Sequence, residues 1–252
     1  MLIRSLFIAF SMYSRIPVPK TEWNESDMRY VFCFFPLIGV VIGVIVWVLG
    51  NFLISIRCGN LLFGCVMSVA PVFITGGIHL DGFLDTLDGI NSYGDKEKKL
   101  EILKDPNSGA FAIIGGIVYF ILSVGFWSEI NIKELNMMPF GYVLSRAFCA
   151  IGAVLFPPAK KTGLAAVFGA GADKFKVTVT MIIFIVIDLI LAVSVDFIGG
   201  VFMLVSAGLC FLYHYFNCVK NFGGITGDLS GYFLQICELV FIIVLVFRGR
   251  LI

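Results

Sequence analysis

The feature that most constrains this chain is a series of long apolar segments separated by short polar ones. A helix needs about 20 mostly apolar residues to cross a bilayer, and seven segments approach that length. They are Val31–Ile54, Leu61–Ile78, Ala110–Trp127, Met137–Phe156, Val177–Val195, Ile198–Phe216 and Leu229–Phe247. Inside lipid the backbone N–H and C=O groups have no water to bond, so such segments must be helices. The sequence therefore predicts an all-α polytopic membrane protein, a bundle of about seven transmembrane helices.

The composition supports the same class of protein. Hydrophobic residues make up 59% of the chain, the mean hydropathy is +0.99, and only 14% of residues are charged, whereas a soluble domain carries about 25%. A net charge of +1 gives no basis for binding nucleic acid. The seven cysteines are scattered without a C-x-x-C pair, which argues against a zinc site or a disulfide framework. We expect one integral-membrane catalytic domain over residues 1–252.

The basic residues predict the orientation of the bundle, because short cytoplasmic loops carry an excess of Lys and Arg. If the N-terminus is cytoplasmic, most basic residues fall on that side. They are Arg4, Arg15, Lys20, Lys96, Lys98, Lys99, Lys104, Lys160, Lys161, Lys174, Lys176 and Lys220. The other side holds Arg57, Lys133, Arg248 and Arg250. We therefore expect a cytoplasmic N-terminus, an external C-terminus, and an uncleaved N-terminal segment that lies at the membrane interface.

Acidic residues gather in one short segment of this apolar chain. Asp81, Asp85 and Asp88 are spaced i, i+4, i+7, which places them within a narrow arc of a helix. Glu101 and Asp105 repeat the i, i+4 spacing in the next helical segment. Carboxylates this close repel one another unless a cation lies between them. Oxygen ligands suit Mg²⁺, or Mn²⁺, so the five residues are the candidate metal ligands.

The alternative is a solvated loop with ordinary surface acids. That interpretation fits Asp95 and Glu97, which alternate with lysines. It fits the three aspartates of the first group poorly, because apolar residues such as Phe83 and Leu87 are interleaved with them. A magnesium site flanked by lysines points to phosphate chemistry, since the metal bridges phosphate oxygens and offsets their charge.

Other polar residues lie in or beside apolar segments. Arg146 lies in an apolar helix, where a lone guanidinium is costly and needs a partner. The partner would be a phosphate or a metal-site carboxylate, unless the side chain extends to the membrane interface. Asp228, Gln235 and Glu238 share one stripe of the last helix, which we expect to face the bundle interior with Asp228 nearest the cytoplasm. The loop Gly223–Asp228 either cradles phosphate with its N–H groups or simply connects two helices.

Six motifs resemble cobalamin synthase, the adenosylcobinamide-GDP ribazoletransferase family. They are SRIPVP at Ser14–Pro19, FFPLIGVVIG at Phe34–Gly43, GGIHLDGFLDTLDG at Gly76–Gly89, LEILKDPNSGAFAIIG at Leu100–Gly115, LSRA at Leu144–Ala147 and GGITGDLSG at Gly223–Gly231. The resemblance covers nearly the whole chain. It implies that α-ribazole, or its 5′-phosphate, attacks the phosphate of cobinamide that carries the GMP. GMP then leaves, and adenosylcobalamin or its phosphate forms.

The resemblance also frames the candidate site. The metal would be Mg²⁺ (or Mn²⁺), and the bilayer would be that of a prokaryotic cell (inner) membrane with the site facing the cytoplasm; homo-oligomerisation is left open. Asp105 is the candidate general base, and Asp81 is the second catalytic candidate. The substrate-binding candidates each lie in one of the quoted motifs and are Arg15, His79, Lys104, Arg146 and Asp228.

Two other functions compete with this one. The acids also resemble those of CDP-alcohol phosphotransferases, because Asp85-Thr86-Leu87-Asp88-Gly89 matches the start of that family's pattern. The Ala-Arg of that pattern is absent, with Asn91-Ser92 following instead, which disfavours phospholipid headgroup transfer. A secondary transporter would place its charges near the bilayer midplane on paired repeats. Here the acids cluster toward one face and no repeat is evident.

Overall fold

The structure, a computed structural model, describes residues 2–20, 24–159 and 171–251. All helical elements in these ranges are bounded as follows: α1 Leu2–Tyr13, α2 Glu25–Met28, η1 Val31–Phe34, α3 Phe35–Ser55, α4 Asn60–Thr75, α5 Ile78–Asn91, α6 Lys96–Ile102, α7 Ala110–Trp127, α8 Ile132–Leu155, α10 Lys174–Val195, α11 Phe197–Asn217, η2 Cys218–Phe222 and α12 Gly227–Leu251. No β-strand occurs in the described ranges. The predicted all-α class is confirmed.

Six of the described helices are long and apolar enough to cross a membrane, and α4 together with α5 could form a seventh, broken span. The two helices of that pair are bent by 99°. The sequence predicts an unbroken span over Leu61–Ile78, but α4 ends at Thr75. Its 16 residues rise about 24 Å, less than the roughly 30 Å of a hydrocarbon core. The expected bundle of about seven helices is therefore six continuous spans and one bent pair.

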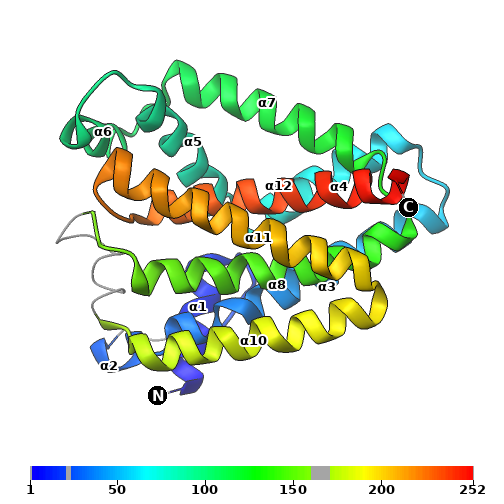
Figure 1. Cartoon of the computed structure of the whole chain (residues 1–252), viewed down its shortest axis with the longest axis horizontal. Helices are drawn as coiled ribbons and strands as arrows, with labels where there is room; N and C mark the ends of the chain where they lie inside the picture. Colours follow the sequence, from blue (N-terminus) through cyan, green and yellow to red (C-terminus); the bar gives the residue numbers. More distant parts are fainter. Residues whose placement is uncertain (1, 21–23, 160–170, 252) are drawn as a thin grey trace.

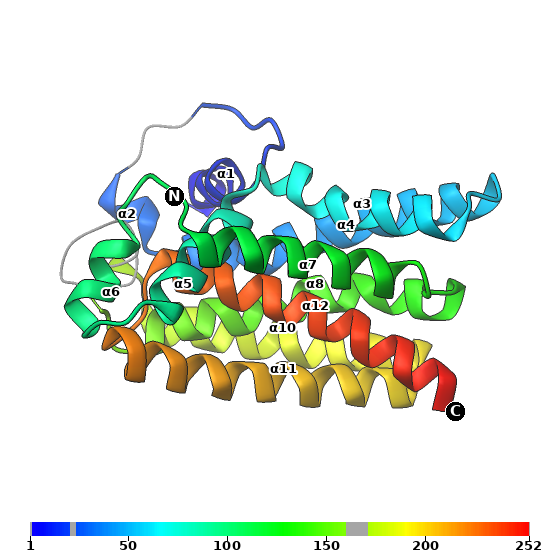
Figure 2. The same ribbon diagram turned by 90° about the horizontal axis from the view of Figure 1, so that it is seen from above.

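The helices run side by side, and their connections gather at two opposite ends (Figures 1 and 2). One end carries α2, α6, the turn from η2 into α12, and the start of α10. The opposite end carries the α3–α4, α7–α8 and α10–α11 connections and the C-terminus. The acidic segment, the lysine-rich helix and the Gly223–Asp228 loop thus share one end, as the sequence predicts. Lys160 and Lys161 lie outside the described residues.

The helix α1 crosses the long axis of the bundle and is seen end-on in Figure 2. Ile8 and Ala9 are buried in the main core, and the Ser5 hydroxyl donates to the carbonyl oxygen of Asp27 at 2.6 Å. Leu2 and Ile3 are exposed. This short apolar helix is docked on the bundle rather than counted among its spans. Its place at the membrane interface stays a prediction.

The start of α8 shows how local capping overrides the hydropathy pattern. The span expected from Met137 begins at Ile132 because Asn131 and Glu134 form a capping box. The Asn131 side chain accepts from the N–H of Lys133 at 2.9 Å, and Glu134 accepts from the N–H of Asn131 at 3.1 Å. These polar residues extend the helix beyond its apolar part.

Two glycines of α3 permit its close packing against α8. A Cβ on Gly39 would lie 2.4 Å from the backbone oxygen of Tyr142, and one on Gly43 would lie 2.7 Å from the Cα of Pro139. Contacts this short with backbone atoms cannot be relieved by rotating a side chain. Small residues of this kind let membrane helices approach closely.

We expect Gly39→Val to destabilise the folded protein by about 1–3 kcal/mol, the usual cost of overpacking. The measurement is thermal unfolding in detergent, with Gly125→Val as the control. Gly125 also lies within a spanning helix, but no atom lies within 4 Å of a Cβ built there. Equal unfolding temperatures for the two variants would contradict the close α3–α8 contact.

Candidate active site

The candidate site begins at the bend between α4 and α5. Gly76 and Gly77 have φ values of 70° and 81°, in the left-handed region that glycine adopts without strain. The Ser14–Pro19 segment packs over this bend. The N–H of Arg15 donates to the carbonyl oxygen of Ile74 at 2.8 Å, and a Cβ on Gly76 would lie 2.4 Å from Arg15 Nε. The predicted substrate-binding residue Arg15 is exposed at this bend.

The three aspartates of α5 lie on one side of the helix, as their spacing predicts. Asp81 is exposed, Asp85 is half-buried and Asp88 is buried. The charges of Asp81, Asp88 and Asp228 all act on the carboxyl group of Asp85. We call these four acids, one of which comes from a different helix, the Asp85 group.

Asp228 reaches this group because α5 and α12 touch at two glycines. A Cβ on Gly82 would lie 2.8 Å from the Cα of Asp228, and one on Gly231 would lie 2.7 Å from the backbone oxygen of His79. The backbones are thus in direct contact, with α12 beside α5 in both views (Figures 1 and 2). The predicted stripe of α12 faces inward, since Gln235 and Glu238 are buried while Asp228 is only partly so.

Asp88 also has a structural partner, the N-terminus of α7. Its Oδ2 accepts from the N–H of Gly109 at 2.6 Å, and its Oδ1 accepts from the N–H of Ala112 at 2.9 Å. The side chain thereby satisfies two donors that the helix itself leaves open, and its charge faces the positive end of the helix dipole. Asp88 fixes α5 to α7 whether or not it also binds a metal.

Glu101 and Asp105 are not among the acids whose charges act on Asp85. Both are exposed, in α6 and in the turn that follows it. The Oδ1 of Asp105 accepts from the backbone N–H and the side-chain amide of Asn107, each at 2.9 Å. These two hydrogen bonds lower the pKa of Asp105 below its usual value. A lowered pKa makes a carboxylate a weaker proton acceptor, which does not favour Asp105 as the base.

The lysine-rich helix α6 is held to the same end of the bundle. Lys99 Nζ donates to the carbonyl oxygen of Ile90 at 3.3 Å and to Asn221 Oδ1 at 3.0 Å. This contact joins the end of α5, α6 and η2. Lys104 is exposed beyond α6. Asp95 accepts from the N–H of Lys98 at 2.9 Å and caps α6, a role that asparagine performs equally well.

Two of the predicted substrate-binding residues lie in the bundle interior. Arg146 has 1% of its surface exposed and forms an ion pair with Glu238 of α12. His79 has 4% exposed, lies near Tyr13 and Phe35, and has no hydrogen-bond partner for either ring nitrogen in the described ranges. The open question of a partner for Arg146 is answered by Glu238, and neither side chain reaches the surface in this conformation.

The Gly223–Asp228 loop makes most of its hydrogen bonds within the protein. The N–H of Ile225 donates to the carbonyl oxygen of Pro157 at 2.8 Å, and the N–H of Gly224 donates to that of Cys218 at 3.1 Å. Thr226 Oγ1 accepts from the N–H of Leu229 at 3.2 Å. The N–H groups of Gly224 and Ile225 are thus engaged within the protein, and the loop connects η2 to α12 and positions Asp228. The phosphate-cradle interpretation of the loop stays a prediction.

The carboxylate oxygens around Asp85 are of the ligand type that a hard divalent cation prefers. All of the acids supply oxygen, which Mg²⁺ and Mn²⁺ prefer. Within the described ranges, however, no three His, Cys, Asp or Glu side chains are gathered closely enough to form a ready-made metal site. Mg²⁺ usually keeps several waters and takes only one or two carboxylates together with substrate phosphates. The residues therefore fit a metal that binds with its substrate.

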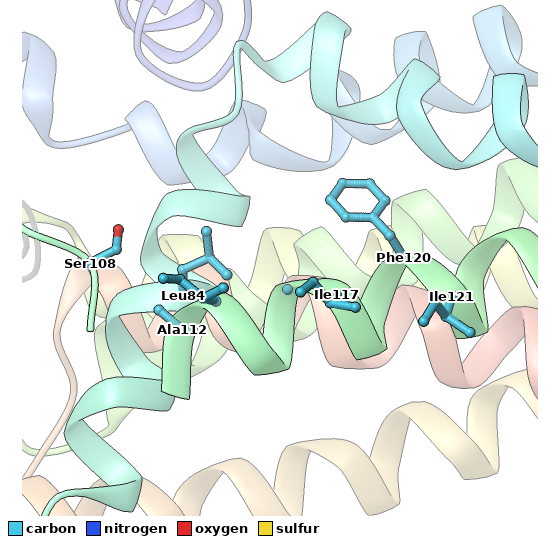
Figure 3. A pocket seen from close by; sticks show the side chains of 8 residues that line it. Leu84, Ser108, Ala112, Ile117, Phe120 and Ile121 are labelled. Carbon is cyan, nitrogen blue, oxygen red and sulfur yellow. The ribbon is translucent and has the colours of Figure 1, made fainter. Parts of the chain in front are cut away.

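An apolar hollow of about 460 Å³ lies along α7, where Leu84 of α5 meets that helix (Figure 3). Leu84 borders it from α5, directly before Asp85, and Ser108 lies at the end nearest the Asp105 turn. The remaining wall is the exposed side of α7, which includes Ile113 and Ile117. Gly116 contributes no side chain, and a Cβ there would contact Leu84 at 3.0 Å.

Sequence reasoning missed three of these relationships. The addition of Asp228 to the acids of α5 depends on a helix crossing between segments about 140 residues apart. The capping of α7 by Asp88 spans 21 residues of chain. The Arg146–Glu238 pair spans 92 residues. Only the shared stripe of Asp228 and Glu238 gave a signal in the sequence.

The comparisons with known proteins agree with the motifs. A model of the family described as cobalamin-5-phosphate synthase matches residues 5–246. A Lachnoclostridium phytofermentans protein named adenosylcobinamide-GDP ribazoletransferase is 47% identical over 238 residues, covering 94% of this chain and 91% of that protein. Proteins of the same name from Clostridium botulinum and Clostridium perfringens are 34% and 30% identical, and each match covers at least 95% of both chains. No solved structure matches the chain.

Proposed function

The chain belongs to the cobalamin-5-phosphate synthase family, and on that premise we propose its reaction, its metal requirement and its orientation in the membrane. It is a transferase of cobalamin nucleotide-loop assembly. The cobinamide phosphate of adenosylcobinamide-GDP passes to α-ribazole, or to α-ribazole 5′-phosphate, and GMP is released. The carrying observation is the 47% identity to a protein of that name across nearly the whole chain.

In this reaction a ribose hydroxyl of α-ribazole forms a bond to the phosphorus that is attached to cobinamide. The bond between that phosphorus and the oxygen of GMP breaks, and the hydroxyl proton must pass to an acceptor. A carboxylate at the site can take it. We assign this role to an acid of the Asp85 group, with Asp81 the most exposed of them on α5. Asp105 remains the alternative base, although its lowered pKa weakens it.

The proposed cofactor is Mg²⁺, with Mn²⁺ as a substitute. Asp85 would be its central ligand, with Asp81, Asp88 and Asp228 nearest to it. Glu101, in α6, and Asp105, in the turn that follows it, remain candidate ligands. The bound ion would offset the negative charge of the pyrophosphate. Arg15, beside the α4–α5 bend, and Lys104, directly after α6, are exposed cations and are proposed to contact the substrate phosphates.

The reaction is tested by incubating purified protein with adenosylcobinamide-GDP, α-ribazole and Mg²⁺ and measuring GMP. A parallel incubation supplies CDP-diacylglycerol and an alcohol acceptor and measures CMP. We expect GMP and no CMP, with activity lost in EDTA and restored by Mg²⁺. CMP release without GMP release would instead identify a phospholipid transferase, and EDTA-resistant GMP release would refute the metal requirement.

In the proposed orientation, the end of the bundle that carries the acidic segment faces the cytoplasmic side of a bacterial inner membrane. Lys98 and Lys220 lie at that end, whereas Lys133 and Arg250 lie at the other. Cysteines introduced at the first pair should react with a membrane-impermeant maleimide only after the cells are opened. Cysteines at the second pair should react in intact cells. Labelling is counted above that of the unsubstituted protein, and reversal of the two patterns would contradict the orientation.

A further inference from the structure

A buried ion pair joins the middle of α12 to α8. The guanidinium of Arg146 pairs with Glu238, and the two residues are 1% and 4% exposed. Arg146 Nη1 also donates to the Ser145 hydroxyl at 2.9 Å, and its Cζ lies 5.4 Å from the centre of the Tyr142 ring. Arg146 is among the largest fully buried side chains described.

One helical turn away, α12 is tied to a second neighbour. The Tyr119 hydroxyl of α7 donates to Gln235 Oε1 at 2.5 Å, and both residues are at least nine-tenths buried. The inner stripe of α12 is therefore held on one side by α8 and on the other by α7. Both contacts are directional, so a slide or rotation of α12 would break them and leave buried polar groups unpaired, which is costly at low dielectric.

Stability alone does not explain an ion pair at this place. Removing two charges from water costs several kcal/mol for each ion, and well-packed apolar residues of similar volume are often equally or more stabilising. Ionisable residues within spanning helices are rare and are a functional hypothesis by default. The pair is therefore expected to specify a position rather than to contribute free energy.

The position that it specifies is that of Asp228. Gln235 and Glu238 follow Asp228 on α12 by about 11 Å and 15 Å of helix rise, and Asp228 touches α5 at Gly82. A rotation or a one-residue slide of α12 would carry Asp228 away from Asp85. Gly231, about two helical turns before Glu238 on α12, packs against the backbone of His79 in the first turn of α5, so the ion pair and the α5 contact lie on the same part of α12.

We propose that Arg146 and Glu238 are positioning residues, which fix the height and rotation of α12 so that Asp228 stays beside Asp85. This inference rests on the proposed role of the acids of the Asp85 group. It replaces a direct contact between Arg146 and substrate phosphate with an effect transmitted through α12. Neither residue has to touch the substrate for its loss to reduce turnover.

The test replaces both charges together, with Arg146→Met/Glu238→Leu. The double variant should unfold at or above the wild-type temperature, because no unpaired charge remains. Its kcat for GMP release should nevertheless fall about tenfold or more, equivalent to about 1.4 kcal/mol in the barrier. The affinity for Mn²⁺, measured by electron paramagnetic resonance with adenosylcobinamide-GDP present and α-ribazole omitted so that no turnover occurs, should weaken in parallel.

Arg146→Lys provides the second variant. It keeps the charge but loses the fork that bonds Glu238 and Ser145 together, so its kcat should lie between those of wild type and the double variant. Arg146→Lys should unfold at a lower temperature than Arg146→Met/Glu238→Leu. Activity would then not follow stability, which a merely structural pair could not produce.

The matched control is the exposed ion pair between Arg250 and Glu129 at the opposite end, where the side chains are 60% and 50% exposed. Arg250→Gln/Glu129→Gln should leave kcat and Mn²⁺ affinity unchanged. A wild-type kcat and Mn²⁺ affinity in the folded double variant would overturn the proposal. If the double variant does not fold, a wild-type kcat and a wild-type Mn²⁺ affinity in Arg146→Lys would overturn the proposal. Failure of the wild-type protein to release GMP would refute the proposed function instead.

Discussion

Asp85→Asn is expected to lower GMP release by about 100-fold or more at the Mg²⁺ concentration that saturates the wild-type protein. A metal that offsets phosphate charge supplies several kcal/mol in the transition state, and each 1.36 kcal/mol is a factor of ten in rate. Asparagine is nearly isosteric with aspartate but neutral. Because Asp85 lies among Asp81, Asp88 and Asp228, removing its charge also relieves repulsion, so the fold should persist.

The measurement is the rate of GMP release, with thermal unfolding as the test of folding. Asp95→Asn and Glu97→Gln are the controls. Asp95 caps α6, and asparagine is an equally good cap, while Glu97 is exposed. Both controls should be near-silent. A folded Asp85→Asn protein with the wild-type rate would remove Asp85 from the site.

Asp88→Ala is expected to lower stability by about 3 kcal/mol or more and to abolish GMP release in the protein that remains folded. Asp88 accepts two hydrogen bonds from the N-terminus of α7, and a hydrogen bond to a charged group contributes about 1.5–3 kcal/mol. Alanine would leave both donors without their acceptor. Loss of that anchor should also let α5 move relative to α7.

Asp88→Asn should lie between these extremes, because one of its two terminal atoms is an amide that cannot accept from an N–H. The measurement is thermal unfolding in detergent, with Asp81→Ala as the comparison. Asp81 is exposed and accepts no hydrogen bond from α7 in the part of the chain that the structure describes, so Asp81→Ala should lower activity without comparable destabilisation. Equal unfolding temperatures for Asp88→Ala and Asp81→Ala would contradict the capping role.

The spans and the clustering of function at one end follow from local sequence. Apolar length predicts each helix, and the i, i+4, i+7 spacing places Asp81, Asp85 and Asp88 on one side of α5. The two consecutive glycines at Gly76 and Gly77 mark the bend, although their left-handed φ values and the 99° angle required the structure. These features depend on residues that are near one another in the chain.

The remaining parts of the site depend on how distant helices meet. Glu101 and Asp105 repeat the spacing of the acids on α5, but periodicity gives no information about the direction in which α6 packs. Asp228 enters the group of Asp85 only because glycines allow α5 and α12 to touch. Glu238 becomes the partner of Arg146 through the packing of α12 against α8. No local pattern specifies such long-range contacts.

The central claim is that the acids around Asp85 bind the metal that the transfer requires, and an Mg²⁺ titration of GMP release tests it most directly. The titration compares wild type, Asp85→Asn, Asp228→Asn and the Asp95→Asn control, each verified as folded. The account predicts that the half-saturating Mg²⁺ concentration rises strongly in Asp85→Asn and Asp228→Asn, or that turnover disappears, while Asp95→Asn matches wild type. Wild-type Mg²⁺ dependence in both Asp85→Asn and Asp228→Asn would contradict it.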